Sequence, residues 1–206
     1  MLITISRQYG AGGSEVARLV AEGLGWSVVD NEIVDRVARR AGLAPEVVAA
    51  QDERAPGFVE RLARALTNSS QEYAVPELGV AVGPEEPSLV RITEMVVKEV
   101  ATEGRKVLVG RAAPAVLGEA YDALHVKVVA ARPFRIRLAA EAERVSPEEA
   151  ERLLDQTDRQ RARYHREHYG RDWDDPSHFH MVLNTGLLGL DGAAQVILER
   201  AHARGW

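Results

Sequence analysis

The chain of 206 residues contains no cysteine, and this absence excludes several kinds of chemistry at once. Without thiols there is no disulfide, no thiolate zinc site and no cysteine nucleophile. A metal ion must then be held by oxygen or imidazole, and Mg²⁺ that arrives with a nucleotide fits best. The spacing of four histidines matches no standard metal site, so we interpret them as surface residues: His165, His168, His178 and His180.

Long apolar runs and an excess of positive charge are also missing. No apolar stretch approaches membrane-spanning length, and the N-terminus runs directly into Leu2-Ile3-Thr4-Ile5 without a basic leader. The net charge of −5, with no basic tail or continuous basic stripe, argues against a general nucleic-acid binder. We therefore expect a cytoplasmic protein without nucleic-acid or membrane partners. Its length and 46% apolar content suit a single domain, residues 1–206, with an inserted or mobile part.

What the sequence does contain is a glycine-rich turn, RQYGAGGS at residues 7–14, between an apolar strand at 3–6 and a helical pattern at 14–24. A strand that ends in glycines leaves backbone N–H groups uncovered, and the next helix adds the positive end of its dipole. The pattern indicates a nucleoside polyphosphate as ligand. The amides expected to bind its phosphates are those of Gly10, Ala11, Gly12, Gly13 and Ser14.

This turn departs in two places from the standard phosphate loop, G-x-x-x-x-G-K-[ST]. Arg7 stands at the first glycine, and Gly13 replaces the lysine that normally reaches the β- and γ-phosphates. Ser14 keeps the hydroxyl that binds magnesium. A loop without the lysine must import positive charge, and Arg7 is the nearest candidate. Tyr9 either lies over the nucleotide or covers the loop.

Along the rest of the chain, β-branched runs alternate with helical stretches, which predicts βα units around a parallel sheet and an α/β fold. The further predicted strands are 26–30, 106–109, 123–129 and 181–184. The further predicted helices are 31–40, 45–66, 89–103, 134–144, 147–167 and 192–203. Residues 67–87 are rich in proline and glycine and predict a mobile flap.

Polar residues follow four of the predicted strands: Ser6-Arg7, Asp30, Gly110-Arg111 and Asn184-Thr185. In an open parallel sheet, ligands bind at the carboxyl ends of the strands, so we expect these residues to line one crevice. Arg111 would then lie beside the phosphate loop, although a surface ion pair is its alternative interpretation. Trp173 is expected to anchor a turn by packing, with a stacked base as the alternative.

A second arginine-rich segment, DRQRAR, lies at residues 158–163 in a predicted helix. Arg159 and Arg163, four residues apart, should share one helix face, whereas Arg161 is rotated from Arg159 by about 200°. The alternative for this cluster is a solvated helix whose arginines pair with acidic neighbours.

The order and spacing of ITISRQYGAGGSE, VVDNEIVDR, VLVGRA, DRQRAR and VLNTGLLGLD resemble the cytidylate kinase-like family, relatives of bacterial cytidylate kinase. The resemblance covers nearly the whole chain apart from residues 50–90. It implies a P-loop NTPase-type three-layer sandwich with a central parallel sheet, and it implies ATP and Mg²⁺ as cofactors. It also implies an acceptor-binding insertion at 45–90 and a helical lid at about 144–178.

The resemblance also assigns roles to individual residues. It implies that Arg36 and Arg111 hold the acceptor monophosphate and that the lid supplies Arg159, Arg161 and Arg163. Asp30 occupies the acidic strand-end position of the family pattern. Asn184 stands for an aspartate near the base-recognition region, and Ala112 for the aspartate after G-R. These departures weaken inheritance of CMP specificity more than they weaken nucleotide binding.

The sequence therefore predicts a kinase that moves the γ-phosphoryl group of ATP onto a nucleoside monophosphate, CMP or dCMP first. The acceptor is already an anion, so the site needs alignment and charge neutralisation rather than a general base. Arg7, Arg111, Arg159 and Arg163 are the expected catalytic arginines, and Asp30, Arg36, Arg111, Arg161 and Asn184 the expected substrate-binding residues. Two alternatives stay open: a nucleotide-binding sensor without catalysis, and a kinase of another small phosphorylated acceptor.

Overall fold

The computed structural model describes residues 1–30 and 86–206. The predicted helices at 31–40 and 45–66 lie outside these residues, as do Arg36 and most of the predicted flap at 67–87.

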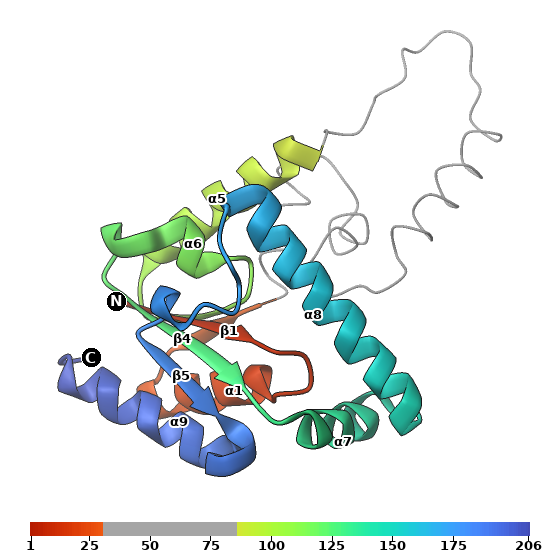
Figure 1. Ribbon diagram of the computed structural model, residues 1–206. Coiled ribbons are helices and arrows are strands. Elements are labelled where there is room, and N and C mark those ends of the chain that lie inside the picture. The colour runs from red at the N-terminus through yellow and green to blue at the C-terminus, as the bar shows by residue number, and fades with distance from the viewer. Residues whose placement is uncertain (31–85) are drawn as a thin grey trace, which may run out of the picture.

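A parallel sheet forms the centre of the described part of the molecule (Figure 1). Its strands follow the order β2-β3-β1-β4-β5, and every neighbouring pair is parallel. The strands are β1 (Leu2–Arg7), β2 (Ser27–Val29), β3 (Lys106–Val109), β4 (Ala123–Val129) and β5 (Met181–Asn184). Because β1 is the central strand, the glycine-rich turn leaves the middle of the carboxyl edge. The predicted α/β class with a central parallel sheet is confirmed.

Helices cover both faces of the sheet, which gives three layers (Figure 1). One face packs against α1 (Gly13–Leu24) and α9 (Thr185–Ala203), and the other against α5 (Glu86–Glu103) and α6 (Ala113–Leu117). Two further helices, α7 and α8, lie beyond the carboxyl ends of the strands and pack against each other. Their bounds are Arg132–Glu143 and Pro147–Tyr169, and short 3-10 turns occupy Gly118–Ala120 (η1) and Pro176–His178 (η2).

Alternation along β1 divides the core between the two faces. Ile3 and Ile5 are fully buried against α1 and α9, whereas Leu2 packs with the valines of α5. On the same face as Leu2, however, Thr4 and Ser6 are buried polar residues. This face is therefore apolar toward β3 and polar where β1 pairs with β4.

The polar half of that face is satisfied internally. The hydroxyl of Thr4 and Nδ1 of His125 are hydrogen-bonded at 2.8 Å, and Lys127 Nζ donates to the side chain of Asp174 at 2.7 Å. The indole N–H of Trp173 donates to the Ser6 hydroxyl at 3.1 Å. The turn after α8 is thereby fixed onto the central strands, next to the start of the glycine-rich turn.

Most element ends lie within two residues of the prediction, and three differences are larger. The helix predicted from 89 begins at Glu86, the short helix α6 was not predicted, and α9 begins at Thr185 instead of 192. The last difference has a local cause, because Gly189 interrupts α9 with φ 73° and ψ 168°. The chain thus forms a short helical segment before the kink and the predicted helix after it.

Candidate active site

The turn between β1 and α1 has the geometry of an anion-binding loop. Gly10 and Gly12 have φ of 73° and 75°, in the left-handed region that glycine tolerates. A Cβ on Gly10 would lie 3.0 Å from the carbonyl carbon of Arg135, so glycine also permits the close approach of α7. Left-handed residues just before a helix are typical of loops whose backbone N–H groups bind an anion. Within this loop the Ala11 N–H donates to the Gln8 carbonyl at 3.2 Å.

The side chain of Arg7 fills the space beside Gly13. A Cβ on Gly13 would lie 2.5 Å from Cβ and 2.8 Å from Cγ of Arg7. At its far end, Arg7 lies against the end of β3, since a Cβ on Gly110 would be 3.1 Å from the Arg7 Cζ. Arg7, only 6% exposed, therefore runs from the phosphate loop to the strand end that carries Arg111. Gly13 leaves space for the Cβ and Cγ atoms of Arg7. The absence of a lysine at position 13 and the presence of an arginine at position 7 are therefore linked by packing.

Arg111 sits immediately after β3, where the backbone turns sharply. Both Arg111 and Ala112 have positive φ, 60° and 47°, although neither is glycine. Two adjacent residues in this region store backbone strain, which is found most often at functional sites. Arg111 is 7% exposed, so its guanidinium is held inside the structure and not extended into solvent.

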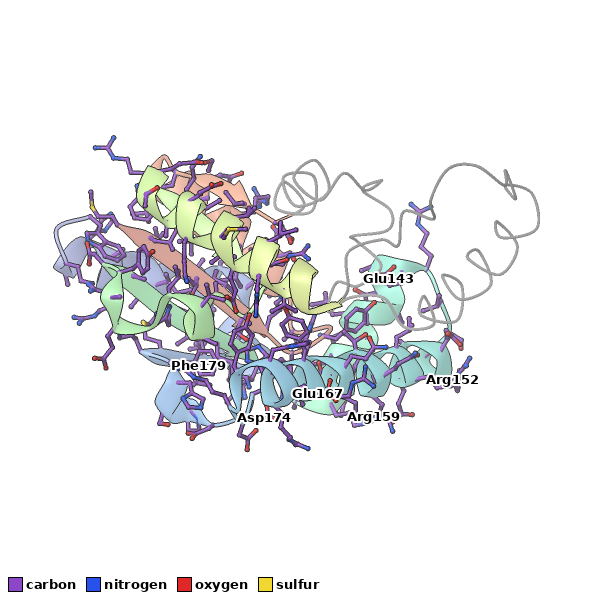
Figure 2. The ribbon with its side chains drawn as sticks, turned by 90° about the horizontal axis from the view of Figure 1, so that it is seen from above. Glu143, Arg152, Arg159, Glu167, Asp174 and Phe179 are labelled. Atoms are coloured by element: carbon purple, nitrogen blue, oxygen red, sulfur yellow. The ribbon has the colours of Figure 1, made fainter. Side chains whose placement is uncertain are left out.

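Helix α8 places Arg161 on the loop and the other two predicted arginines away from it. Arg161 is 3% exposed and its NH1 donates to the backbone carbonyl of Arg7 at 2.8 Å. Arg159 lies on the outer side of α8 (Figure 2) and donates to the Asp155 carbonyl at 2.8 Å. Arg163 is 69% exposed and lies 3.6 Å from Glu167. The regular helix therefore gives the shared outer face expected for Arg159 and Arg163.

The remaining predicted site residues lie along the carboxyl edge of the sheet. Asp30 follows β2 and Asn184 ends β5, which are the two outer strands, so about 19 Å of sheet separates their strands. The side chain of Asn184 accepts a hydrogen bond from the Gly186 N–H at 3.0 Å and caps α9. Ser14, the second residue of α1, is exposed at the mouth of the loop.

Side chains from α7, α8 and α9 also contact the loop, and two of them, Arg135 and Asp158, were not predicted as site residues. Asp158 accepts a hydrogen bond from the Tyr9 N–H at 2.9 Å, and Arg135 donates to the Tyr9 carbonyl at 3.3 Å. The Thr185 hydroxyl donates to the Ala11 carbonyl at 2.8 Å. In the sequence, Asp158 stands out only as one of the acidic residues that can pair with the neighbouring arginines. No local pattern marks Arg135, because its partner Tyr9 lies 126 positions away in the sequence, whereas Thr185 belongs to a polar strand end that was expected to line the site.

The structure shows the positions of Tyr9 and Trp173, for each of which the sequence allowed two interpretations. Tyr9 packs against the apolar contact between α7 and α8, and its hydroxyl donates to Glu143 at 3.1 Å. Burial, and then the nearby Glu143 carboxylate, raise the pKa of Tyr9 to about 12. Trp173 is 3% exposed and anchors its turn by packing, as expected.

The histidines do not form a metal centre. Across the residues the structure describes, no group of three or more His, Cys, Asp or Glu side chains could hold a metal ion. The prediction of surface residues was wrong for His165, which is 5% exposed on the inner side of α8. Its ring faces Trp173, with the ring centroids 6.5 Å apart.

The strand order, the glycine turn after the central strand and the helices on both faces define a P-loop-type α/β kinase fold. The model of the cytidylate kinase-like family matches residues 2–187, and the chain belongs to this family. Family membership supports nucleotide-dependent phosphoryl transfer in general terms. No curated protein matches the chain.

Solved structures share the fold at low sequence identity. An uncharacterized protein from Eubacterium ventriosum has a TM-score of 0.69 at 18% identity, with 97% of both chains covered. Shikimate kinase from Bacteroides thetaiotaomicron has a TM-score of 0.56 at 13% identity, with 98% of both chains covered. TT1252 from Thermus thermophilus has a TM-score of 0.52 at 18% identity, with 97% of both covered. At these identities the likeness shows the fold alone.

A membrane-spanning helix is not found in the part of the chain that the structure describes, where no helix has the necessary length and apolar character.

Proposed function

We propose that the protein transfers the γ-phosphoryl group of ATP, with Mg²⁺, to a nucleoside monophosphate, with CMP or dCMP as the first candidates. The observation that carries this proposal is the path of Arg7. The stem of its buried side chain passes Gly13 of the loop that lacks a lysine, and its permanently charged guanidinium ends beside Gly110, at the base of Arg111. A bare glycine turn would not need such a cation.

The loop fits the phosphates of ATP on structural grounds. Gly10 and Gly12 adopt left-handed conformations just before the first turn of α1, and this arrangement is typical of a backbone that binds phosphate. The exposed Ser14 hydroxyl would hold Mg²⁺, which when bound neutralises charge on the β- and γ-phosphates. The amides near Gly12 and Gly13 would hold the phosphates, and Arg7 would balance charge on the transferring group.

The acceptor phosphate is assigned to Arg111, whose guanidinium is positioned by the strained turn after β3. A planar guanidinium binds two phosphate oxygens at once and aligns the acceptor without a general base. Arg36 and Asp30 stay predictions for the same side of the site, and Asn184 for the base. Arg159 and Arg163 stay predictions too, since from the outer face of α8 they need a movement of that helix to reach ATP.

The test is ADP formation by the purified protein with ATP, Mg²⁺ and a panel of nucleoside monophosphates, with ATP alone as the blank. We expect acceptor-dependent turnover that is strongest with CMP or dCMP. Turnover only with another phosphorylated small molecule would replace the acceptor. ATP binding by calorimetry without turnover on any acceptor would overturn the kinase assignment and favour a nucleotide sensor.

Arg111→Ala, compared with Arg105→Ala, tests the assigned acceptor site. Both arginines have positive φ and flank β3, but Arg105 is exposed at the amino end of the strand. We expect Arg111→Ala to lower turnover by roughly 100-fold and Arg105→Ala to leave it unchanged. Equal turnover in the two variants would remove Arg111 from the site.

A further inference from the structure

We infer that Asp158 is the positioning residue of the phosphate loop: from α8 it fixes the peptide groups of Tyr9 and thereby aims the amides that follow. The inference rests on the proposed function for its activity readout. Its structural part concerns contacts that exist without any ligand.

Asp158 and Arg135 together bind both peptide groups of Tyr9. One carboxylate oxygen of Asp158 accepts from the Tyr9 N–H at 2.9 Å, and the other accepts from NH1 of Arg135. The same NH1 donates to the Tyr9 carbonyl at 3.3 Å. Tyr9 lies just beyond β1, so side chains from α7 and α8 replace the ladder hydrogen bonds that a strand would supply.

The negative charge of Asp158 is balanced by two neighbouring arginines. Besides Arg135, the guanidinium of Arg161 lies 3.7 Å from an Asp158 oxygen while it donates to the Arg7 carbonyl. The side chains of Arg135, Arg161 and Asp158 are 10%, 3% and 19% exposed. A carboxylate flanked by two buried guanidiniums can lie next to an anion site without strong repulsion, and it keeps a directional acceptor on Tyr9.

The side chain of Tyr9 is fixed from the same two helices. Its ring packs with the apolar cluster that includes Ala139 and Leu154, and its hydroxyl donates to Glu143. Tyr9 is thus held by its backbone and by its ring. The next residue, Gly10, begins the left-handed turn, so the plane of the Tyr9–Gly10 peptide sets the direction of the amides at the start of α1.

Fixing the Tyr9 peptide groups matters because the N–H groups of the loop must point toward the phosphates. Preorganised N–H groups stabilise a developing charge only if they already point to its position, and errors of about 1 Å cost around 100-fold in rate. Asp158 is placed to prevent this error, although it does not itself touch the phosphates in the proposed arrangement.

The experiment compares Asp158→Ala and Asp158→Asn with the matched control Asp155→Ala. Asp155 is on the outer side of α8 and accepts two hydrogen bonds from Arg132, at 2.7 and 2.9 Å, away from the loop. Three experiments are made: steady-state kinetics, which give kcat and KM for ATP, thermal unfolding, and amide hydrogen exchange of residues 8–12 in the nucleotide-free protein.

We expect Asp158→Ala to lower kcat/KM for ATP by roughly 100-fold and to speed exchange of the Tyr9 amide. Asp158→Asn keeps an acceptor for the Tyr9 N–H but loses the negative charge that faces Arg135 and Arg161, so it should retain most of the protection and part of the activity. Asp155→Ala should match the parent in both. The partial rescue by asparagine separates positioning from a general loss of folding.

The two proposals fail in different ways. If the parent protein turns over and Asp158→Ala is as active as Asp155→Ala, the positioning role is overturned and the kinase assignment stands. If the parent shows no turnover, the kinase assignment fails, and exchange alone decides the role of Asp158. Faster exchange of the Tyr9 amide in Asp158→Ala then supports the role, and unchanged exchange overturns it.

Discussion

The Cβ atom of Arg7 lies where a side chain at position 13 would begin: an added Cβ on Gly13 would be 2.5 Å away from it. Side chains at positions 7 and 13 would therefore collide. The arginine at position 7 requires a glycine at position 13. In the standard phosphate loop the same two positions are glycine first and lysine later. This chain has the opposite combination, with the large cation on the strand and the glycine on the helix.

This exclusion predicts how Gly13→Ala behaves in three backgrounds. With Arg7, and also with Arg7→Ala, the Cβ of residue 7 remains, so Gly13→Ala should cost about 1–3 kcal/mol. With Arg7→Gly the crowding disappears and alanine should stabilise the first turn of α1 by up to about 1 kcal/mol. Urea unfolding of the six proteins measures the coupling. An equal cost of Gly13→Ala in all three backgrounds would contradict it.

Gly10→Ala should be more damaging than Gly25→Ala, although both glycines have positive φ. Each alanine pays the left-handed penalty of about 1 kcal/mol, but nothing lies within 4 Å of a Cβ at Gly25. A Cβ at Gly10 meets the backbone of Arg135, which has no flexible end that could move aside. We expect Gly10→Ala to lower both the free energy of unfolding and the affinity for ATP, measured by urea unfolding and calorimetry. Equal losses in the two variants would show that the contact with α7 is unimportant.

Removal of Arg161 should destabilise the protein far more than removal of Arg163. Arg161→Ala leaves the Arg7 carbonyl without its buried donor and the Asp158 carboxylate without one of its two cations, at a cost of roughly 2–4 kcal/mol. Arg163 is exposed and its ion pair with Glu167 is long, so Arg163→Ala should change stability by less than about 0.5 kcal/mol. Thermal and urea unfolding measure both. A large loss for Arg163→Ala would indicate a contact that the exposed helix face does not account for.

Stability should fall below about pH 6.5 because of His125. Burial is the main cause that lowers the pKa of this histidine below its ordinary value of 6.5 in the folded protein. The unfolded chain then binds a proton more readily, so the contribution is complete above 6.5 and is lost as the pH falls through the folded-state value. His180, whose pKa is also lowered by burial, adds to the same effect.

The check is the pH dependence of the free energy of unfolding. His125→Gln keeps a donor for the Gly118 carbonyl, which His125 Nε2 contacts at 3.1 Å, and should flatten the slope between pH 5 and 6.5. His202→Gln, at an exposed position near the end of α9, is the control and should leave the slope as it is. A parent protein whose stability is constant over this range would contradict the prediction.

The sheet and most of its helices could be predicted from sequence because their signals are local. Ile3 and Ile5 alternate with polar residues, Val107-Leu108-Val109 is a buried run, and Ser146 with Pro147 marks the start of α8. Helix α6 was missed because five residues give almost no periodicity. The early start of α9 was missed because Gly189 interrupts the helical pattern.

The part of the site that the backbone forms could be predicted from the sequence. The part that side chains form could be predicted much less well. The glycines at 10, 12 and 13 identify the loop from the sequence, since few residues adopt its conformation. That Arg161 faces inward while Arg159 and Arg163 face outward depends on how α8 docks, which helical periodicity alone leaves open. Arg135 and Asp158 reach Tyr9 only through the tertiary fold, so no spacing in the sequence reveals them.

The tight contact between Trp173 and Ser6 gives the protein an optical reporter of its own. The three tryptophans divide into two environments: Trp26 and Trp206 lie against each other with ring centroids 5.7 Å apart, whereas Trp173 is buried and donates to Ser6, the residue before Arg7. Of the three tryptophans, Trp173 is therefore the one that is hydrogen-bonded to β1, the strand that leads into the loop. In a chain without cysteine to carry a dye, its fluorescence emission offers a label-free view of events at the end of β1.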